Sequence, residues 1–99
     1  MTTFEVLAEP SRRQILDLLA KGERPVGELV KHTKMSQPLV SKHLRVLREA
    51  GLVVARADAQ RRLYAIDPKP LKEIDRWLAR YRPFWTHKLD QLEAHLDKE

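Results

Sequence analysis

The most informative segment is Ser36-Gln37-Pro38-Leu39-Val40-Ser41-Lys42-His43-Leu44-Arg45-Val46-Leu47, which has the pattern of an amphipathic helix. Serine is a strong N-cap residue and proline is favoured in the first helical turn, so Ser36 and Pro38 mark the start. Because an α-helix turns by about 100° per residue, Val40, Leu44 and Leu47 fall on one apolar face. We predict a helix over residues 37–50 that is ended by Gly51.

The opposite face of this helix is polar and basic. It carries Ser41, Lys42, Arg45, Arg48 and Glu49, and Gln37 lies in the first turn. An α-helix fits the major groove of B-DNA, where Gln can pair with adenine and Lys or Arg with guanine. A helix N-terminus can also donate backbone N–H groups to a phosphate. The helix alone leaves two interpretations open, a DNA-reading helix and an ordinary amphipathic surface helix.

Three shorter helices are predicted before this segment, over residues 3–8, 10–20 and 26–32. Proline suits the first turn of a helix and glycine its end, which places Pro10 at the start of the second helix and Gly22 beyond its end. Thr33-Lys34-Met35 then forms a tight connection into the helix that begins at Gln37. The third and fourth helices therefore form a helix-turn-helix.

Two strands are predicted after Gly51, over residues 52–56 and 62–66, with a polar loop between them over residues 57–61. This β-hairpin has the place of a wing beside the fourth helix. Its arginines, Arg56, Arg61 and Arg62, are within reach of the adjacent minor groove or the DNA backbone in such an arrangement. The alternative is that one or two of them form ion pairs on the surface.

One long helix is predicted over residues 71–96, with an apolar stripe that is too long for one small core to cover. The stripe consists of Leu71, Ile74, Leu78, Tyr81, Trp85, Leu89, Leu92 and Leu96. Pro83 interrupts the pattern, so it should either kink this helix or split it. We predict a two-fold dimer in which residues 70–97 pair with their copy and with Phe4 and Leu7 of the first helix. The alternative is a helix that folds back on its own domain.

The charge of the chain is concentrated in its middle third. The 99 residues have a formal net charge of +5, and residues 36–69 carry seven Lys or Arg against three Asp or Glu. An excess of positive charge beside the predicted fourth helix and hairpin is expected of a surface that meets a polyanion. A chain of this length suits a single domain over residues 1–99.

Composition excludes several classes of protein. The sequence has no cysteine, which removes disulfides, thiolate metal sites and cysteine nucleophiles. It has no Gly-rich phosphate loop, no His-Glu-x-x-His motif and no nucleophile elbow, so we expect no enzyme and no cofactor. No signal peptide and no apolar run of about 20 residues is present, so we expect a cytoplasmic protein without a membrane partner.

A histidine pair near the end of the chain is the remaining candidate for a metal site. His87, Gln91 and His95 share one helix face, and Asp90 lies near them. Such a set can bind Zn²⁺ or Ni²⁺. Ordinary polar residues near a helix end explain the same pattern, and we predict no metal.

Several stretches resemble the ArsR/SmtB-type winged helix-turn-helix repressors, and together they span nearly the whole chain. They are Leu7-Ala8-Glu9-Pro10-Ser11-Arg12-Arg13-Gln14-Ile15-Leu16, the Ser36–Leu47 segment, Ala50-Gly51-Leu52-Val53 and Arg61-Arg62-Leu63-Tyr64. The last helix resembles a subgroup without the known metal ligands, since Asp75 is followed at two residues by Trp77 where zinc sensors have Asp-x-His. Many relatives carry a glycine in the wing loop where this chain has Asp58-Ala59-Gln60. Because alanine does not favour a positive φ, we expect a different turn and a weaker DNA contact there.

This resemblance implies a homodimer, an operator with two-fold symmetry, repression relieved by an unidentified effector, and residues near DNA that include His43. Our helical projection puts His43 at the edge of the apolar face.

The predicted fold is mostly α with a small hairpin, in the order α-α-α-α-β-β-α. The predicted DNA contacts are Ser36, Gln37, Pro38, Ser41, Lys42, His43, Arg45, Arg48, Arg56, Arg61 and Arg62. The predicted dimer contacts are Phe4, Leu7, Leu78, Tyr81, Trp85, Leu89, Leu92 and Leu96. The alternative function is a winged-helix module that binds an acidic protein.

Overall fold

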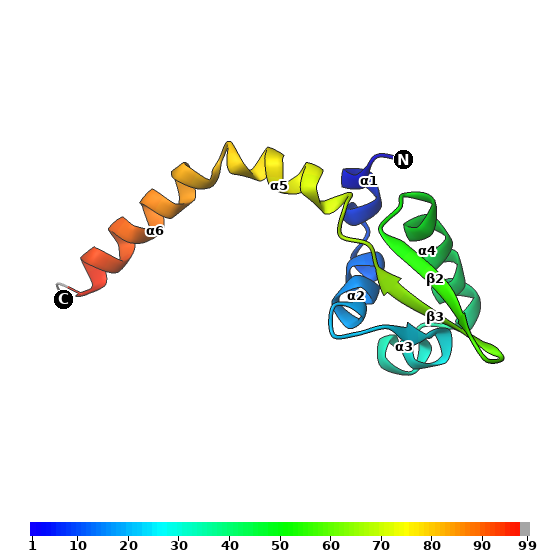
Figure 1. Ribbon diagram of the computed structural model, residues 1–99. Coiled ribbons are helices and arrows are strands. Elements are labelled where there is room, and N and C mark those ends of the chain that lie inside the picture. The colour runs from blue at the N-terminus through cyan, green and yellow to red at the C-terminus, as the bar shows by residue number, and fades with distance from the viewer. Residues whose placement is uncertain (98–99) are drawn as a thin grey trace.

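The computed structural model describes residues 1–97, and the side chains among them except those of residues 87, 90 and 94–97. A body of four helices and a small sheet carries a two-helix arm that extends away from it (Figure 1). The elements are α1 (Thr3–Ala8), α2 (Pro10–Leu19), β1 (Arg24–Pro25), α3 (Val26–Thr33), α4 (Gln37–Glu49), β2 (Val53–Asp58), β3 (Arg61–Ile66), α5 (Leu71–Ala79) and α6 (Arg82–Asp97). This is the predicted winged helix-turn-helix order, with one short strand added and the last helix divided.

The turn between α3 and α4 is fixed by side-chain hydrogen bonds at both helix ends. The Thr33 hydroxyl donates to the Leu29 carbonyl at 2.6 Å and accepts from the Met35 backbone N–H at 3.3 Å. The Ser36 hydroxyl accepts from the Leu39 backbone N–H at 3.3 Å, which is the predicted N-cap. The Thr33 bonds therefore fix the end of α3 and the first residues of the turn, and the Ser36 bond fixes the first turn of α4.

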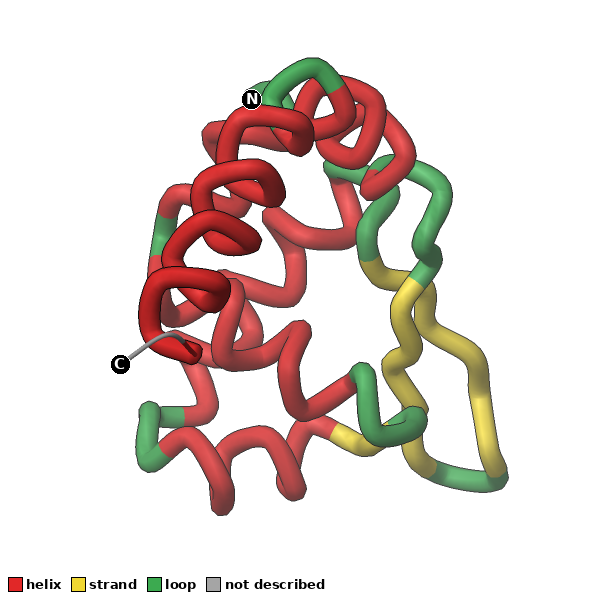
Figure 2. Tube along the Cα trace, turned by 90° about the vertical axis from the view of Figure 1, so that its left-hand side faces the viewer, coloured by secondary structure: helices red, strands yellow, loops and turns green. Residues whose placement is uncertain are grey.

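The hydrophobic core is formed by side chains of α1, α2, α3, α4 and the start of the hairpin. Figure 2 shows the helices of the body gathered beside the strands. From α4 it takes Val40, Leu44 and Leu47, the three residues that the helical projection placed on the apolar face. The other buried members are Val6, Ile15, Leu16, Leu19, Leu29, Leu52 and Val53. Burying this face of α4 leaves the polar face toward solvent.

The sheet has three antiparallel strands in the order β1-β3-β2, one more than predicted. β1 pairs Arg24 with Tyr64 of β3. The β2–β3 pairing continues to Asp58 and Arg61, so the predicted loop over residues 57–61 is wrong, and the turn is Ala59-Gln60. Ala59 has φ 56°, which contradicts the expectation that it would avoid a positive φ. The strand pairing on both sides imposes that conformation on a residue that resists it.

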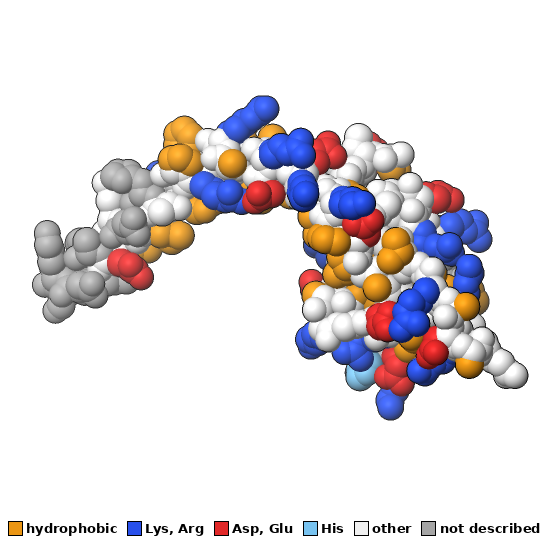
Figure 3. All heavy atoms as spheres, viewed as in Figure 1, with side chains coloured by type: hydrophobic (Ala, Val, Ile, Leu, Met, Phe, Trp, Pro, Cys, Tyr) orange, Lys and Arg blue, Asp and Glu red, His pale blue; other side chains and the backbone are white. Residues whose placement is uncertain are grey.

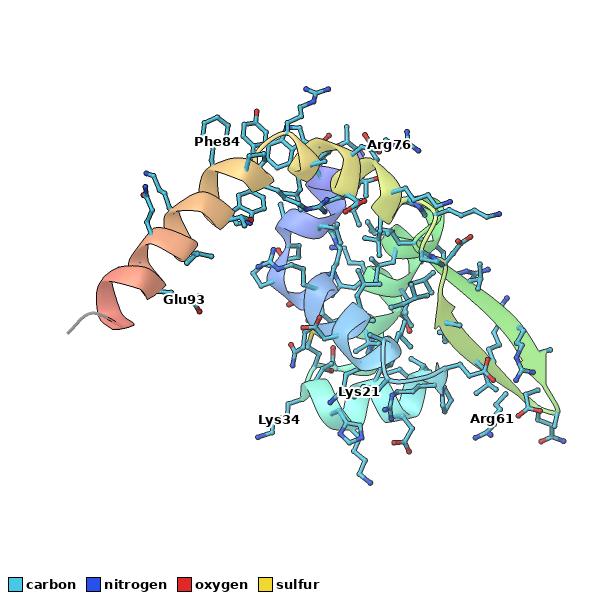
Figure 4. The ribbon with its side chains drawn as sticks, turned by 60° about the vertical axis from the view of Figure 1, so that its left-hand side comes forward. Lys21, Lys34, Arg61, Arg76, Phe84 and Glu93 are labelled. Atoms are coloured by element: carbon cyan, nitrogen blue, oxygen red, sulfur yellow. The ribbon has the colours of Figure 1, made fainter. Side chains whose placement is uncertain are left out.

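The predicted last helix is two helices, α5 and α6, separated at residues 80–81. Pro83 is the reason, because a proline ring inside a helix clashes with the carbonyl four residues earlier, and that residue is Ala79, where α5 ends. An ion pair between Arg82 and Asp75 spans the break. We call residues 71–97 the arm. Figure 4 shows Phe84 projecting from the arm away from the body.

Candidate nucleic-acid interface

The outward face of α4 is polar, basic and exposed. Its exposed residues are Gln37, Pro38, Leu39, Ser41, Lys42, Arg45, Arg48 and Glu49, and the Ser36 cap is also exposed. Three of these are cations, and no ion pair of these cations occurs in the described part of the chain. The helix therefore presents free guanidinium and ammonium groups together with the amide of Gln37 and the hydroxyl of Ser41.

His43 is placed differently from the other predicted contacts in α4, because its side chain is only 9% exposed. It faces the start of α2, where Arg12 and Glu9 are its charged neighbours, and Lys42 lies beside it. Its Nδ1 atom is buried and has no hydrogen-bond partner in the described part of the chain. Burial, and then the charge of Arg12, lower the pKa of His43.

We expect His43 to make the free energy of unfolding depend on pH. The unfolded chain takes up this proton below an ordinary pKa of about 6.5, whereas the folded state resists it. The unfolded state therefore binds more protons, and stability falls as the pH drops below that value. Urea unfolding at pH 7.5 and 5.5 should show a smaller loss for His43→Gln than for the wild type. Equal losses in the wild type and in His43→Gln would contradict this role.

The three arginines of the hairpin have different surroundings. The Arg56 guanidinium holds both carboxylate oxygens of Glu23, with Nε at 3.0 Å from Oε2. This contact lowers the pKa of Glu23. Arg61 pairs with Asp58 across the turn at 3.3 Å. Arg62 is exposed and makes no ion pair within the described residues, so it is the free cation of the hairpin.

The hairpin tip and the start of α4 lie at the same end of the body. In Figures 1 and 2 the Ala59-Gln60 turn projects beyond the sheet at the end where α3 leads into α4. Figure 4 shows Lys34, in the α3–α4 turn, and Arg61, beside the hairpin tip, along one edge of the molecule. One rod-shaped ligand can therefore contact α4 and the hairpin together.

A groove of about 470 Å³ joins α4 to the hairpin, and the sequence analysis did not find it. Arg45, Arg48 and Glu49 line it from α4, and residues 53–55 line it from β2. The groove forms because the polar face of α4 and the start of β2 come together only in the fold. The side chains of Arg45 and Arg48 therefore border the space between α4 and the hairpin.

Glu23 is the site residue that sequence reasoning missed. It precedes β1, and its partner Arg56 is 33 residues further along the chain. No local pattern marks such a pair, because the contact depends on the docking of β1 against β3. Arg56 and Arg61 thus form the surface ion pairs that the sequence left as an alternative for the hairpin.

The arm exposes large apolar side chains between Trp77 and Leu92, and part of this surface is visible in Figure 3. Trp77 contacts Phe4 of α1 with ring centroids 5.5 Å apart, and Tyr81 contacts Trp77 at 5.1 Å. Of the predicted dimer contacts, Phe4, Tyr81, Trp85, Leu89 and Leu92 are exposed, whereas Leu7 and Leu78 are partly buried. The side chain of Leu96 lies outside the described residues. The body of the same chain does not cover these apolar side chains, so another surface is needed to bury them.

The described part of the chain also bears on metal binding and on membrane insertion. Among the described side chains, no group of three His, Asp or Glu residues is arranged to hold a metal ion. The side chains of His87, Asp90 and His95 lie outside the described part, so it stays a prediction that these residues bind no metal. No helix among the described residues is long and apolar enough to span a bilayer.

Comparison with known proteins identifies a family. Residues 9–54 match the model described as bacterial regulatory protein, arsR family. An HTH-type transcriptional regulator of Mycobacterium tuberculosis is 40% identical over 97% of this chain and 87% of its own length. The transcriptional repressor SdpR of Bacillus subtilis is 30% identical over 79% of this chain and 87% of its own. The homodimeric winged helix-turn-helix DNA-binding domain of a possible ArsR-family regulator from Mycobacterium bovis has a TM-score of 0.64 and 35% identity, covering 78% of this chain and 74% of that one.

Proposed function

Because this chain belongs to the ArsR family of bacterial regulatory proteins, we propose that it represses transcription by binding a two-fold symmetric operator as a homodimer. A DNA-binding transcriptional regulator is not an enzyme. In each subunit α4 lies in the major groove, and the β2–β3 hairpin rests on the neighbouring backbone or minor groove. A chromosomal target makes the cytoplasm the site of action.

The observation that carries this proposal is the exposed face of α4 beyond a capped N-terminus. The Ser36 hydroxyl caps the start of the helix, and Gln37, Ser41 and Lys42 project from its first two turns. A base-reading helix needs both features, because hydrogen bonds to base edges discriminate only if the donors and acceptors are held in place. Fixing them beforehand also reduces the entropy lost on binding.

The arm supports the dimer. Its exposed aromatic and aliphatic side chains pack against the same side chains of a second copy in an isologous contact. A hollow of about 280 Å³ at the base of the arm, lined by residues such as Leu7, Leu16 and Leu71, extends this apolar surface onto the body. A two-fold dimer places two copies of α4 about 34 Å apart, which is one turn of DNA.

The residues divide into three groups by what they can touch. Gln37 and Ser41 reach base edges, with Ser36 and Pro38 beside them, whereas Lys42, Arg45, Arg48 and Arg62 reach phosphates. Arg56 and Arg61 hold the hairpin through their carboxylate partners. His43 packs α4 against α2. The signal that would relieve repression acts without a thiolate site, because the chain has no cysteine.

Selection of bound duplexes from a random DNA library tests this function directly. We expect enriched sequences to contain an inverted repeat with half-site centres about 10–10.5 base pairs apart. Failure to enrich any duplex at low salt, by a protein that sediments as a monomer, would overturn the proposal. Binding to an acidic protein with no duplex enriched would favour a protein-interaction module instead.

The salt dependence of DNA binding should separate Arg62 from Arg56. Log K falls with log salt with a slope of about −0.9 for each phosphate neutralised, so Arg62→Ala should reduce the slope by about 1.8 per dimer. Arg56→Ala should leave the slope unchanged, because Glu23 already holds that guanidinium. Fluorescence anisotropy titrations from 50 to 200 mM salt, a range over which this effect is large, measure both slopes. Equal changes in the two variants would mean that Arg56 leaves Glu23 for a phosphate.

A further inference from the structure

Leu39 is an exposed apolar residue that neither the core nor the dimer explains. Its side chain is 40% exposed in the first turn of α4. Most other large exposed apolar side chains of the described part belong to the arm or to α1, the surface that the proposed dimer would bury. Apart from the N-terminal Met1, the exceptions are Leu39 and Val54. Leu39 therefore stays open to solvent in a dimer that has no DNA.

The position of Leu39 is fixed at the leading end of the helix. The backbone N–H of Leu39 donates to the Ser36 hydroxyl at 3.3 Å. Pro38, which precedes Leu39, restrains the backbone of Gln37. Two residues along an α-helix are about 200° apart around its axis, so the side chains of Gln37 and Leu39 project from opposite sides of the helix. The first turn thus carries a hydrogen-bonding side chain on one side and an aliphatic side chain on the other.

Thymine is the base whose major-groove edge carries an apolar group, the C5 methyl. We propose that Leu39 is a specificity-determining residue that packs on the methyl group of a thymine in each half-site. The inference rests on the proposed function, because it requires α4 to enter the major groove. Contact with the methyl removes apolar surface of both partners from water, which a cytosine or a purine at that position does not reproduce.

Deoxyuridine substitution tests this contact, because uracil differs from thymine only by the methyl group. In the operator obtained by selection, each thymine of a half-site is replaced in turn. For the wild type, one position should lose about fourfold in affinity, and about fifteenfold when both half-sites are substituted, as expected for one methyl buried per half-site. At that position Leu39→Ala should bind the thymine and uracil operators equally well.

Gln14→Ala is the control. It shortens another exposed side chain, in α2 away from the α4–hairpin end, and should keep the full preference for thymine. Thermal unfolding of both variants checks that each folds as the wild type does. Leu39→Ala that still prefers thymine, or a wild type that is indifferent to every uracil, would overturn the role of Leu39. Selection of no operator at all would instead overturn the proposed function.

Discussion

Replacing Trp85 and Leu89 with glutamine should turn the protein into a monomer and weaken operator binding by about 10²–10⁴-fold. Both side chains are exposed on α6 and lie on the stripe that we propose to be the dimer contact. In the dimer, binding of one α4 holds the other near its half-site at a high effective concentration. A monomer loses this advantage although its DNA-contacting residues are intact. Sedimentation gives the oligomeric state, and gel shifts on whole and half operators give the affinities.

The matched control is the double variant Lys88→Gln and Glu93→Gln, which changes two exposed polar residues of α6 and leaves the net charge unaltered. It should remain dimeric and bind the operator as the wild type does. The variant with glutamine at 85 and 89 should bind an isolated half-site as well as the wild-type subunit does. A variant that stays dimeric would show that another surface joins the subunits.

Gln37→Ala should reduce the preference for operator over random DNA by about 1–3 kcal/mol, or about 5- to 150-fold. The side chain stands at the first residue of α4, where an amide can pair with two atoms of adenine. Affinity for random DNA should change little, because phosphate contacts dominate it. Competition titrations with operator and random duplexes measure the ratio of the two affinities.

Gln14→Ala is the control for this variant, because Gln14 is also exposed but lies in α2, away from the α4–hairpin end. It should leave the preference unchanged. Substitution of the operator adenine that Gln37 contacts should cost the wild type affinity and cost Gln37→Ala nothing. If Gln37→Ala weakened operator and random DNA equally, the residue would touch only the backbone.

Local chemistry made most of the fold predictable. Ser36, Pro38 and the spacing of Val40, Leu44 and Leu47 fixed the start and the buried face of α4, because capping and helical periodicity depend on neighbouring residues. The exposed face follows from the same periodicity. His43 lies at the edge of the apolar face, and its burial depends on α2, which packs against it.

Contacts between distant segments were not predictable from local patterns. β1 is two residues long, too short for an alternating pattern, and it exists because β3 pairs with it. The Glu23–Arg56 pair depends on that docking, so no spacing rule reveals which hairpin arginine stays free. The positive φ of Ala59 likewise results from the register of β2 and β3, since the residue itself disfavours it.

The break between Ala79 and Arg82 separates the part of the chain that determines base preference from the part that determines the spacing of the half-sites. In the proposed dimer, the residues of α4 select the bases of each half-site, whereas the direction in which α6 leaves the body sets the distance between the two half-sites and their relative rotation about the duplex. A substitution at Pro83 would therefore alter the preferred gap without altering the preferred bases. During evolution, the base preference and the half-site spacing can therefore diverge independently. The first changes through substitutions in α4, and the second through substitutions near the α5–α6 break.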